Sequence, residues 1–486
     1  MNERPSLSPG TNLVAPPTVS DLELSCRLPL LVLFISAAVW FFIGSLCALL
    51  VSIKFHAPAF LAEPAWLTYG RLRPAGFDAF LYGGCLQAGL GVGIWLLADL
   101  GRTLAPRLAL TWGAAFWNFA VTIGFLGVLA GDSTGFVGLE MPSYSAVPLF
   151  VGYVLLGVFS VLLFHRRRDP VAFPSQWLLL AALFWFPWIY STAELLLVAY
   201  PVRGVAQAVI DWWYSNNLSV VWLTLAGFAA VFYMVARHAR RPLHSHYLAL
   251  MVFWLMLLFV SWAGIPNSAP VPVWMPTAST IATVLLVIPI IALALNVHGT
   301  LAGNYAVLRG NAPLQFVLFG VAAFVAANLM RVCGTLADSG QELHFTWFTV
   351  ATRQLHAYGF FAMVMFGAVY EILPRIMGLA FPWPRLVRLH FGLAAAGIVL
   401  LVVPLGIAGV VQDFQLLNPS VPFLDISRTS LAFLRVSTIG DLLLAASQFL
   451  FLGNVLALVA QFYRVRTKAA YLLVTADLFK PAGAKV

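Results

Sequence analysis

The chain has 486 residues, of which 61% are hydrophobic and only 9% are charged. Soluble domains carry about 25% charged residues, so this composition excludes a water-soluble globular protein and indicates a membrane protein. The formal net charge of +9 does not indicate nucleic-acid binding, because the basic residues cluster between hydrophobic runs, where they set membrane topology.

Residues 1–25 are polar and rich in Pro and Ser, and we interpret them as a disordered cytoplasmic tail. About twelve apolar runs follow, each long enough to cross roughly 30 Å of hydrocarbon, without the period-two alternation of a β-barrel. We therefore predict an all-α domain of about twelve transmembrane helices over 26–466 and a cytoplasmic tail over 467–486. The predicted spans lie near 28–53, 76–98, 108–130, 147–165, 176–199, 216–236, 246–264, 276–298, 313–332, 353–374, 389–411 and 436–462.

Arginines follow each even-numbered span, whereas the loops after the third and seventh spans contain no Lys or Arg. Because positive residues accumulate on the cytoplasmic side, both termini are expected in the cytoplasm. Arg71 and Arg73, together with Lys54, break this pattern on the outer side. They indicate either contact with an anionic partner or a solvated loop, and composition leaves both interpretations open.

Five ionisable residues fall within or at the ends of the apolar runs. A charge at the centre of a bilayer costs about 2.5–3.5 kcal/mol or more unless it is paired or hydrated. We therefore expect these residues to contribute to an intramembrane polar network. They are Asp78, Glu194, Arg331, Arg353 and Asp441.

Short motifs occur in order between residue 70 and about residue 412. They are GRLRP at 70–74, DWWY at 211–214, SWAG at 261–264, HFTWFTV at 344–350, YG at 358–359, PR at 374–375 with Gly378, and AGVVQ at 408–412. Together they resemble the large subunit of haem–copper oxidases, on the branch shared by cbb3-type cytochrome oxidases and bacterial nitric oxide reductases. The resemblance implies a subunit I-like helical bundle in a bacterial inner (cytoplasmic) membrane.

The resemblance also implies six histidine ligands, because the family binds a low-spin haem, a high-spin haem and a copper or non-haem iron. Aligned on the motifs, none of the six positions is histidine, and the family's tyrosine on the seventh helix is Val260. The low-spin positions are Gly76 and Gln354, the high-spin position is Thr352, and the distal-metal positions are Asn216, Pro266 and Asn267.

Two residues near these positions affect the interpretation. Arg353 stands between Thr352 and Gln354, where a guanidinium would repel an iron cation. It is expected either to pair with Asp78 or Asp441 or to reach interfacial water, and both alternatives stay open. His356 points about 200° around the helix from Gln354 and is the fallback ligand for a haem b if the alignment is shifted.

We therefore expect no haem, no metal and no catalytic residue. The predicted function is a scaffold or adaptor subunit of a respiratory electron-transfer complex. By family analogy, its partners would be a membrane-anchored c-type cytochrome on the outer face and other respiratory subunits, within the lipid bilayer and without nucleic acid. One alternative is an active terminal cytochrome c oxidase or nitric oxide reductase catalytic subunit. Another is a proton or small-solute conduit.

Overall fold

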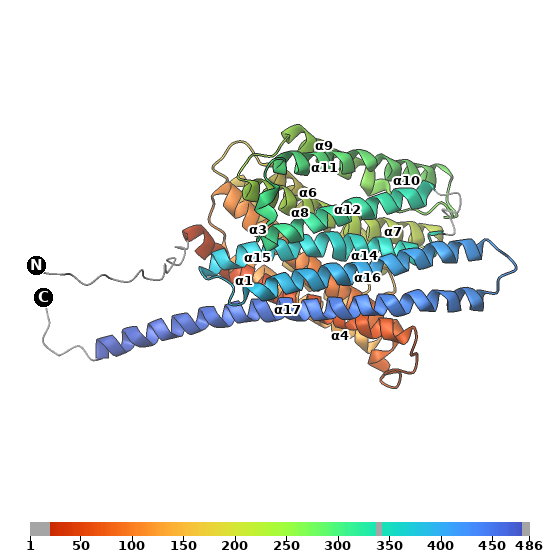
Figure 1. Cartoon of the computed structure of the whole chain (residues 1–486), viewed down its shortest axis with the longest axis horizontal. Helices are drawn as coiled ribbons and strands as arrows, with labels where there is room; N and C mark the ends of the chain where they lie inside the picture. The colour runs from red at the N-terminus through yellow and green to blue at the C-terminus, as the bar shows by residue number, and fades with distance from the viewer. Residues whose placement is uncertain (1–19, 337–342, 479–486) are drawn as a thin grey trace, which may run out of the picture.

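The computed structural model describes residues 20–336 and 343–478, which form a bundle of helices without any strand (Figure 1). Eleven helical spans in these residues are long and apolar enough to cross a membrane. A shorter apolar helix, His246–Trp262, occupies the place of the predicted seventh span. The structure therefore confirms the all-α membrane bundle, with eleven full-length spans and one short helix.

Several spans are built from consecutive helical segments, and the second, fifth, sixth and tenth each contain a π-helical segment. The segments are α1 (Asp21–Lys54), η1 (Ala65–Leu67), α2 (Tyr69–Asp78), η2 (Ala79–Leu86), α3 (Gln87–Gly101), α4 (Arg107–Ala130), α5 (Ser143–His165), α6 (Pro174–Ala193), η3 (Glu194–Ala199), α7 (Val205–Asn216), η4 (Asn217–Trp222), α8 (Leu223–Ala239), α9 (His246–Phe259), η5 (Val260–Trp262), α10 (Trp274–Leu285), α11 (Val287–Leu301), η6 (Tyr305–Leu308), α12 (Ala312–Leu336), α14 (Trp347–Gln354), η7 (Leu355–Ala362), α15 (Met363–Met377), α16 (Pro384–Leu416) and α17 (Phe423–Leu478).

The first and last helices extend into the predicted tails. The Ser20 hydroxyl accepts a hydrogen bond from the Glu23 backbone N–H, and the Glu23 carboxylate accepts one from the Ser20 backbone N–H. This capping box begins α1 at Asp21. Residues 21–25 and 467–478 are therefore helical, and α17 projects beyond the bundle (Figure 1). The rest of the predicted tails lies outside the described residues.

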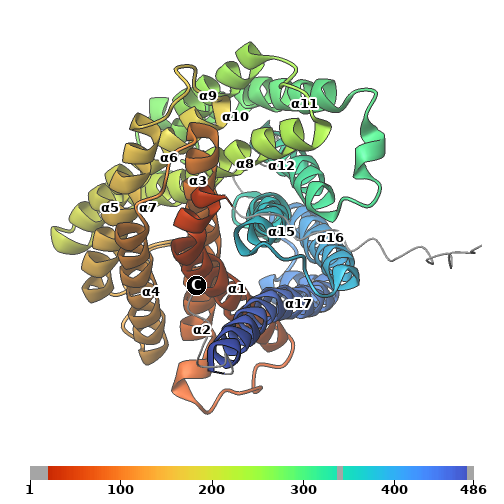
Figure 2. The ribbon, with the colours of Figure 1, turned by 90° about the vertical axis from the view of Figure 1, so that its left-hand side faces the viewer.

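Three spans form the centre of the bundle. The most apolar windows of the second, sixth and tenth spans are 100%, 94% and 83% buried, whereas those of the other long spans are 33–61% buried. Viewed along the helices, α3, α8 and α15 lie inside, and α4, α5, α9, α11 and α17 lie toward the rim (Figure 2). These central spans are the ones in which the resemblance places most of the ligand positions.

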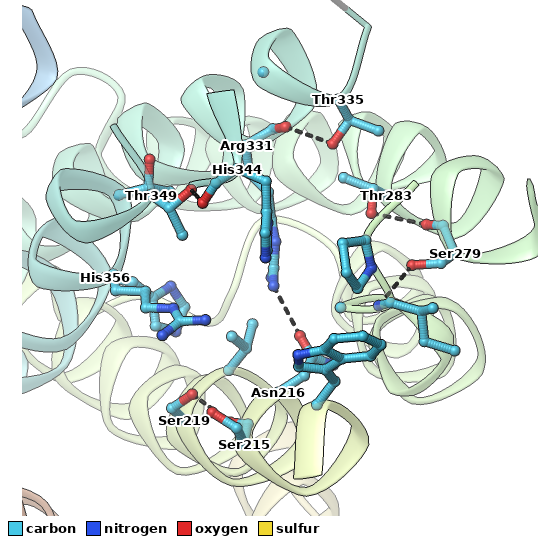
Figure 3. A pocket seen from close by; sticks show the side chains of 18 of the residues that line it. Ser215, Asn216, Ser219, Ser279, Thr283, Arg331, Thr335, His344, Thr349 and His356 are labelled. Carbon is cyan, nitrogen blue, oxygen red and sulfur yellow. Dashed lines mark hydrogen bonds between the residues drawn. The ribbon is translucent and has the colours of Figure 1, made fainter. Parts of the chain in front are cut away.

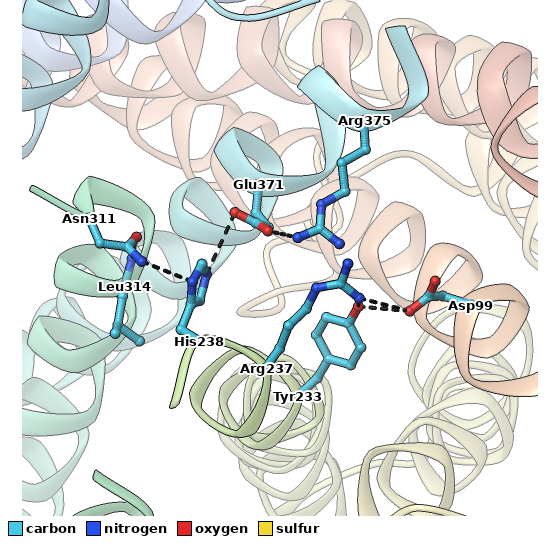
Figure 4. Close-up of polar contacts among 8 residues, drawn as sticks. All are labelled: Asp99, Tyr233, Arg237, His238, Asn311, Leu314, Glu371 and Arg375. Atoms are coloured by element: carbon cyan, nitrogen blue, oxygen red, sulfur yellow. Dashed lines mark hydrogen bonds and ion pairs between the residues drawn. The ribbon is translucent and has the colours of Figure 1, made fainter. Parts of the chain in front are cut away.

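Polar contacts cluster at the ends of the three central spans, at the face of the bundle where α1 begins, which we call the terminal face (Figure 4). Asp99 on α3 accepts a hydrogen bond from the Tyr233 hydroxyl at 2.7 Å and pairs with Arg237 at 3.4 Å. Glu371 on α15 pairs with Arg375 on the same helix and faces His238 on α8 at 3.6 Å. These contacts link α3 to α8 and place Glu371 of α15 beside His238 of α8.

Candidate functional site

The predicted low-spin ligand position on the second span is packed directly against α1. Gly76 lies on α2, and a Cβ added to it would meet the Cys47 Cβ at 2.6 Å. Glycine lets the two helices approach this closely, as small residues do at helix contacts in membranes. An imidazole at Gly76 would need space that Cys47 occupies.

Aromatic side chains fill the neighbouring space between the second and tenth spans. The rings of Phe80 and Tyr358 stack with their centroids 4.0 Å apart, and the Tyr358 hydroxyl lies 3.2 Å from the Ser45 hydroxyl. Phe41 packs against Phe366 with centroids 5.1 Å apart. All five of these side chains are buried. The region that the resemblance assigns to a low-spin haem is therefore occupied by protein side chains.

The other predicted ligand positions meet around one polar cavity of about 240 Å³ (Figure 3). Asn216, Pro266, Asn267 and Thr352 all line it, although they come from three different parts of the chain. Gln354 is half-buried and does not line it. The structure thus brings together the four positions that the resemblance implies around a high-spin haem and a second metal.

The three polar side chains at these positions are engaged within the protein. The Asn216 side-chain amide donates to the backbone carbonyl of Val260 at 2.8 Å. The Asn267 side-chain oxygen accepts a hydrogen bond from the Thr280 hydroxyl at 2.8 Å. The Thr352 hydroxyl donates to the Phe348 carbonyl of its own helix at 2.9 Å. None of these side chains presents an imidazole to the cavity.

The SWAG motif has a structural explanation at this cavity. Gly264 adopts φ +104°, a conformation that side chains other than glycine rarely allow. A Cβ at this position would also lie 2.7 Å from the Asn216 Cβ. The glycine therefore brings the backbone that follows η5 against α7 and sets one wall of the cavity.

Two arginines give the cavity a positive charge. Arg331 on α12 is half-buried and donates to the Asn216 side-chain oxygen at 2.8 Å. Arg353 on α14 also lines the cavity, and its side chain is exposed. Asp211 is the one acidic side chain that lines it among the described residues, and its carboxylate accepts a hydrogen bond from the Val137 N–H at 3.1 Å.

Two histidines also line the cavity. His356 is buried, and its Nε2 lies 3.5 Å from the Thr224 hydroxyl, with Phe324 and Phe360 beside the ring. His344 precedes α14, where burial and then the nearby arginines lower its pKa from 6.5, so its imidazole is neutral at neutral pH. His356 thus lies inside the bundle with Thr224 as its polar neighbour.

The remaining ionisable residues of the predicted network lie elsewhere. Asp78 is buried and faces Glu140, a residue of the loop between α4 and α5 that the sequence analysis did not single out. Burial raises the pKa of Glu140 to about 7. Glu194 lies beside Tyr190, and Asp441 lies beside Ser52.

The expected ion pairs of Arg353 are not formed. No ion pair joins it to Asp78 or Asp441 among the residues that the structure describes. Its electrostatic neighbours are Arg73 and Asp211. Arg331 and Arg353 therefore share one cavity. The acidic members of the predicted network, which are Asp78, Glu194 and Asp441, do not line this cavity.

The basic residues before the second span have local roles. Arg71 is half-buried and donates to the Leu129 carbonyl at the end of α4 at 3.3 Å. Arg73 is exposed, with its guanidinium 5.8 Å from the centre of the Tyr69 ring. Lys54 is buried and donates to the carbonyls of the loop that follows α1. Arg73 is thus the one residue of the three that presents an exposed side chain.

The sequence matches the family described as cytochrome c and quinol oxidase polypeptide I over residues 29–443. The chain belongs to this family. Proteins of the family are subunits of respiratory oxidases, so the oxidase polypeptide I resemblance predicted from the motifs is confirmed. The match covers all the predicted ligand positions and all the central spans.

Individual relatives and a solved structure agree with this assignment. The chain is 25% identical over 402 residues to a cytochrome c oxidase subunit 1 homolog of Azorhizobium caulinodans, covering 78% of this chain and 71% of the relative. It is 24% identical over 400 residues to the cbb3-type cytochrome c oxidase subunit CcoN1 of Stutzerimonas stutzeri, covering 78% and 82%. A heme-copper terminal oxidase dimer has a similar fold, with a TM-score of 0.69 at 12% identity, covering 89% of this chain and 84% of that one.

The residues of this polypeptide I chain do not fit the metal groups that its family implies. The low-spin position on α2 is closed by the contact between Gly76 and Cys47. The cavity of about 240 Å³ is below the roughly 300 Å³ at which pockets begin to hold drug-sized ligands, and a haem is at least that large. Among the described residues, no group of three or more His, Cys, Asp or Glu side chains could hold a metal ion.

Proposed function

We propose that this chain is a haem-free and copper-free polypeptide I that acts as a scaffold or adaptor subunit of a respiratory electron-transfer complex. The observation that carries the proposal is the direct contact of Gly76 with Cys47, which leaves no space for an imidazole. The stacked rings of Phe80 and Tyr358 support it, because they occupy the space beside this contact.

The proposal includes a membrane orientation and a partner. With the terminal face in the cytoplasm of a bacterium, both ends of the chain are cytoplasmic, in agreement with the positive-inside rule. The opposite face, formed by the loops at 131–142 and 263–273, then lies outside. A membrane-anchored c-type cytochrome would dock there, and the exposed Arg73 would contact an acidic surface of it.

The absence of haem can be tested on the purified full-length chain. We expect no Soret band in its absorption spectrum and no stoichiometric iron or copper by elemental analysis. A Soret band that disappears in the His356→Ala variant would instead support an active oxidase or nitric oxide reductase with His356 as a haem ligand. A Soret band unaffected by this change would also contradict the proposal.

The adaptor role needs a separate test in native membranes. Affinity purification of the tagged chain in a mild detergent is expected to recover a c-type cytochrome, detected by covalent haem staining. Arg73→Gln is expected to reduce this recovery, whereas Arg428→Gln, which changes an exposed arginine of α17, is the matched control. Equal recovery with both variants would remove Arg73 from the docking surface, and no cytochrome in any preparation would contradict the adaptor role.

A proton conduit is the second candidate, and a row of buried phenols favours it. The Tyr82 hydroxyl lies 2.6 Å from the Tyr214 hydroxyl and donates to the Gly138 carbonyl at 2.5 Å. Asp78 with Glu140 lies near one end of this row, and Tyr190 lies near the other. Proton uptake by liposomes containing the chain, abolished by Tyr82→Phe, would support a conduit over an adaptor.

A further inference from the structure

The polar cavity contains two guanidinium groups, those of Arg331 and Arg353, that form no ion pair within 4 Å with any of the described residues. The one hydrogen bond found for the Arg331 guanidinium in these residues is to the neutral side-chain oxygen of Asn216 (Figure 3). Arg331 is half-buried, and an unpaired charge that is partly withdrawn from water is costly, so this arrangement favours a bound counter-ion.

The charges around the cavity have one predominant sign. Two guanidinium groups and one carboxylate, that of Asp211, line it among the described residues, which leaves a formal charge of +1. Arg73 adds positive potential next to Arg353. Field lines from like charges are concentrated in such a hollow, which raises the local concentration of anions.

The donors around the cavity suit oxygen-bearing anions. A guanidinium presents parallel N–H groups that match the oxygens of a carboxylate, nitrate or phosphate in two hydrogen bonds. The neutral His344 also lines the cavity, whereas the hydroxyl of Thr349 is engaged by donating to the His344 carbonyl at 2.9 Å. The volume of about 240 Å³ is below the roughly 300 Å³ needed for a drug-sized molecule, so the ligand must be small.

We propose that the cavity is a binding site for a small oxyanion, held by Arg331 and Arg353. The site lies where the family resemblance places a high-spin haem and a second metal, and the inference therefore rests on the proposed haem-free state. Val137 and His344 line the cavity from loops of the face opposite the terminal face. This position points to a free anion from the water on that side as the ligand.

Binding can be measured on the purified full-length chain in a phospholipid-free detergent. The probes are sodium phosphate, nitrate and acetate, with sodium chloride for comparison, each titrated at constant ionic strength. At a free concentration c, a bound anion stabilises the folded chain by RT ln(1 + c/Kd), so the melting temperature rises with the anion concentration and reports the Kd. At least one oxyanion is expected to bind at least about tenfold more tightly than chloride, because a spherical ion cannot use both N–H groups of the guanidinium fork.

Variants locate the site, and two kinds of substitution are expected to change the affinity for the oxyanion in opposite directions. Arg331→Gln and Arg353→Gln are each expected to weaken oxyanion binding by about tenfold or more, whereas Arg353→Lys keeps the charge and weakens it less. Asp211→Asn removes the negative charge and should tighten binding. Arg428→Gln, outside the cavity, is the matched control and should leave binding unchanged.

The outcomes separate this inference from the haem-free proposal. No oxyanion binding, equal binding of chloride, or binding unaffected by both Arg→Gln variants would overturn the site, even if the chain proves to be colourless. A Soret band would overturn the haem-free proposal on its own. If an Arg→Gln variant does not fold, Asp211→Asn and Arg353→Lys still decide the question. Stabilisation that requires added phosphatidylglycerol would support the oxyanion site and identify a lipid phosphate as the ligand.

Discussion

The contact at Gly76 allows a quantitative test of how closely α1 and α2 pack. An added Cβ would lie 2.6 Å from the Cys47 Cβ and 3.6 Å from the Gly44 carbonyl oxygen. Non-bonded carbons are most favourable at about 3.5–4.0 Å, so Gly76→Ala must separate the two helices by about 1 Å. Because the opposing atom is a Cβ, rotation of the Cys47 side chain cannot relieve the contact.

Overpacking of this kind costs about 1–3 kcal/mol. We expect Gly76→Ala to lower the free energy of unfolding by about 2 kcal/mol, measured by thermal or detergent-induced unfolding of the purified chain. Gly392→Ala in α16 is the matched control, because no atom lies within 4 Å of its added Cβ. This control should be neutral or stabilising by up to about 1 kcal/mol, since alanine favours helix over glycine.

A second change tests the cause of the destabilisation. Cys47→Gly removes the opposing Cβ, so combining it with Gly76→Ala should give less than the sum of the two single effects. We expect a coupling energy of about 1–2 kcal/mol in this double-mutant cycle. If Gly76→Ala is as benign as Gly392→Ala, the contact is loose, and the argument that no haem ligand fits at this position is refuted.

Three further changes test other parts of the structure. Glu371→Gln should lower the free energy of unfolding by about 1–3 kcal/mol, because the partly buried Arg375 guanidinium loses its carboxylate, whereas Asp425→Asn in an exposed pair should change it by less than about 1 kcal/mol; equal effects would contradict a role for the terminal face in stability. The pKa of Glu140 is raised from 4.5 to about 7, so the contribution of Glu140 to stability is fully present below pH 4.5 and is lost as the pH rises through about 7. Glu140→Gln should flatten this decline in melting temperature, and an unchanged profile would show that another group causes it. Gly264→Ala should cost about 1–3 kcal/mol, because it forces a Cβ at φ +104° against Asn216; a neutral effect in thermal unfolding would contradict the tight cavity wall.

Hydrophobic runs were sufficient to predict the helices but not their lengths or internal form. The twelfth run was predicted over 436–462, whereas α17 covers Phe423–Leu478, because hydropathy marks only the apolar part of a helix. The π-helical segments η2 and η7 were not predicted. Their hydrogen-bond pattern depends on how the central spans pack against each other, and such segments often occur at functional sites.

Four of the six ligand positions that the motifs indicate line one cavity, but the partners of the charged residues could not be predicted. Hydropathy locates a residue along the membrane normal and does not tell which neighbouring helix it faces. Arg353 is expected either to pair with Asp78 or Asp441 or to reach interfacial water. In the structure Asp78 faces Glu140, whereas the exposed Arg353 lies near Asp211. Glu140 was missed because it belongs to a loop, although a carboxylate next to a span was a signal available in the sequence.

Of the two regions that the resemblance assigns to cofactors, one is filled by apolar and aromatic side chains and the other is lined by charged ones. Their positions in the fold explain this difference. The contact of Gly76 with Cys47 lies between the first two spans, with Phe80 and Tyr358 stacked nearby, and all four residues are buried. Apolar and aromatic groups stabilise such a place because they bring no charge that needs compensation. The cavity around Arg353 is bordered by loops, where water and anions can compensate a charge. Replacing Arg353 by Met should therefore cost little stability, whereas replacing Phe80 by Arg should prevent folding, and a chain that tolerates both equally would refute this distinction.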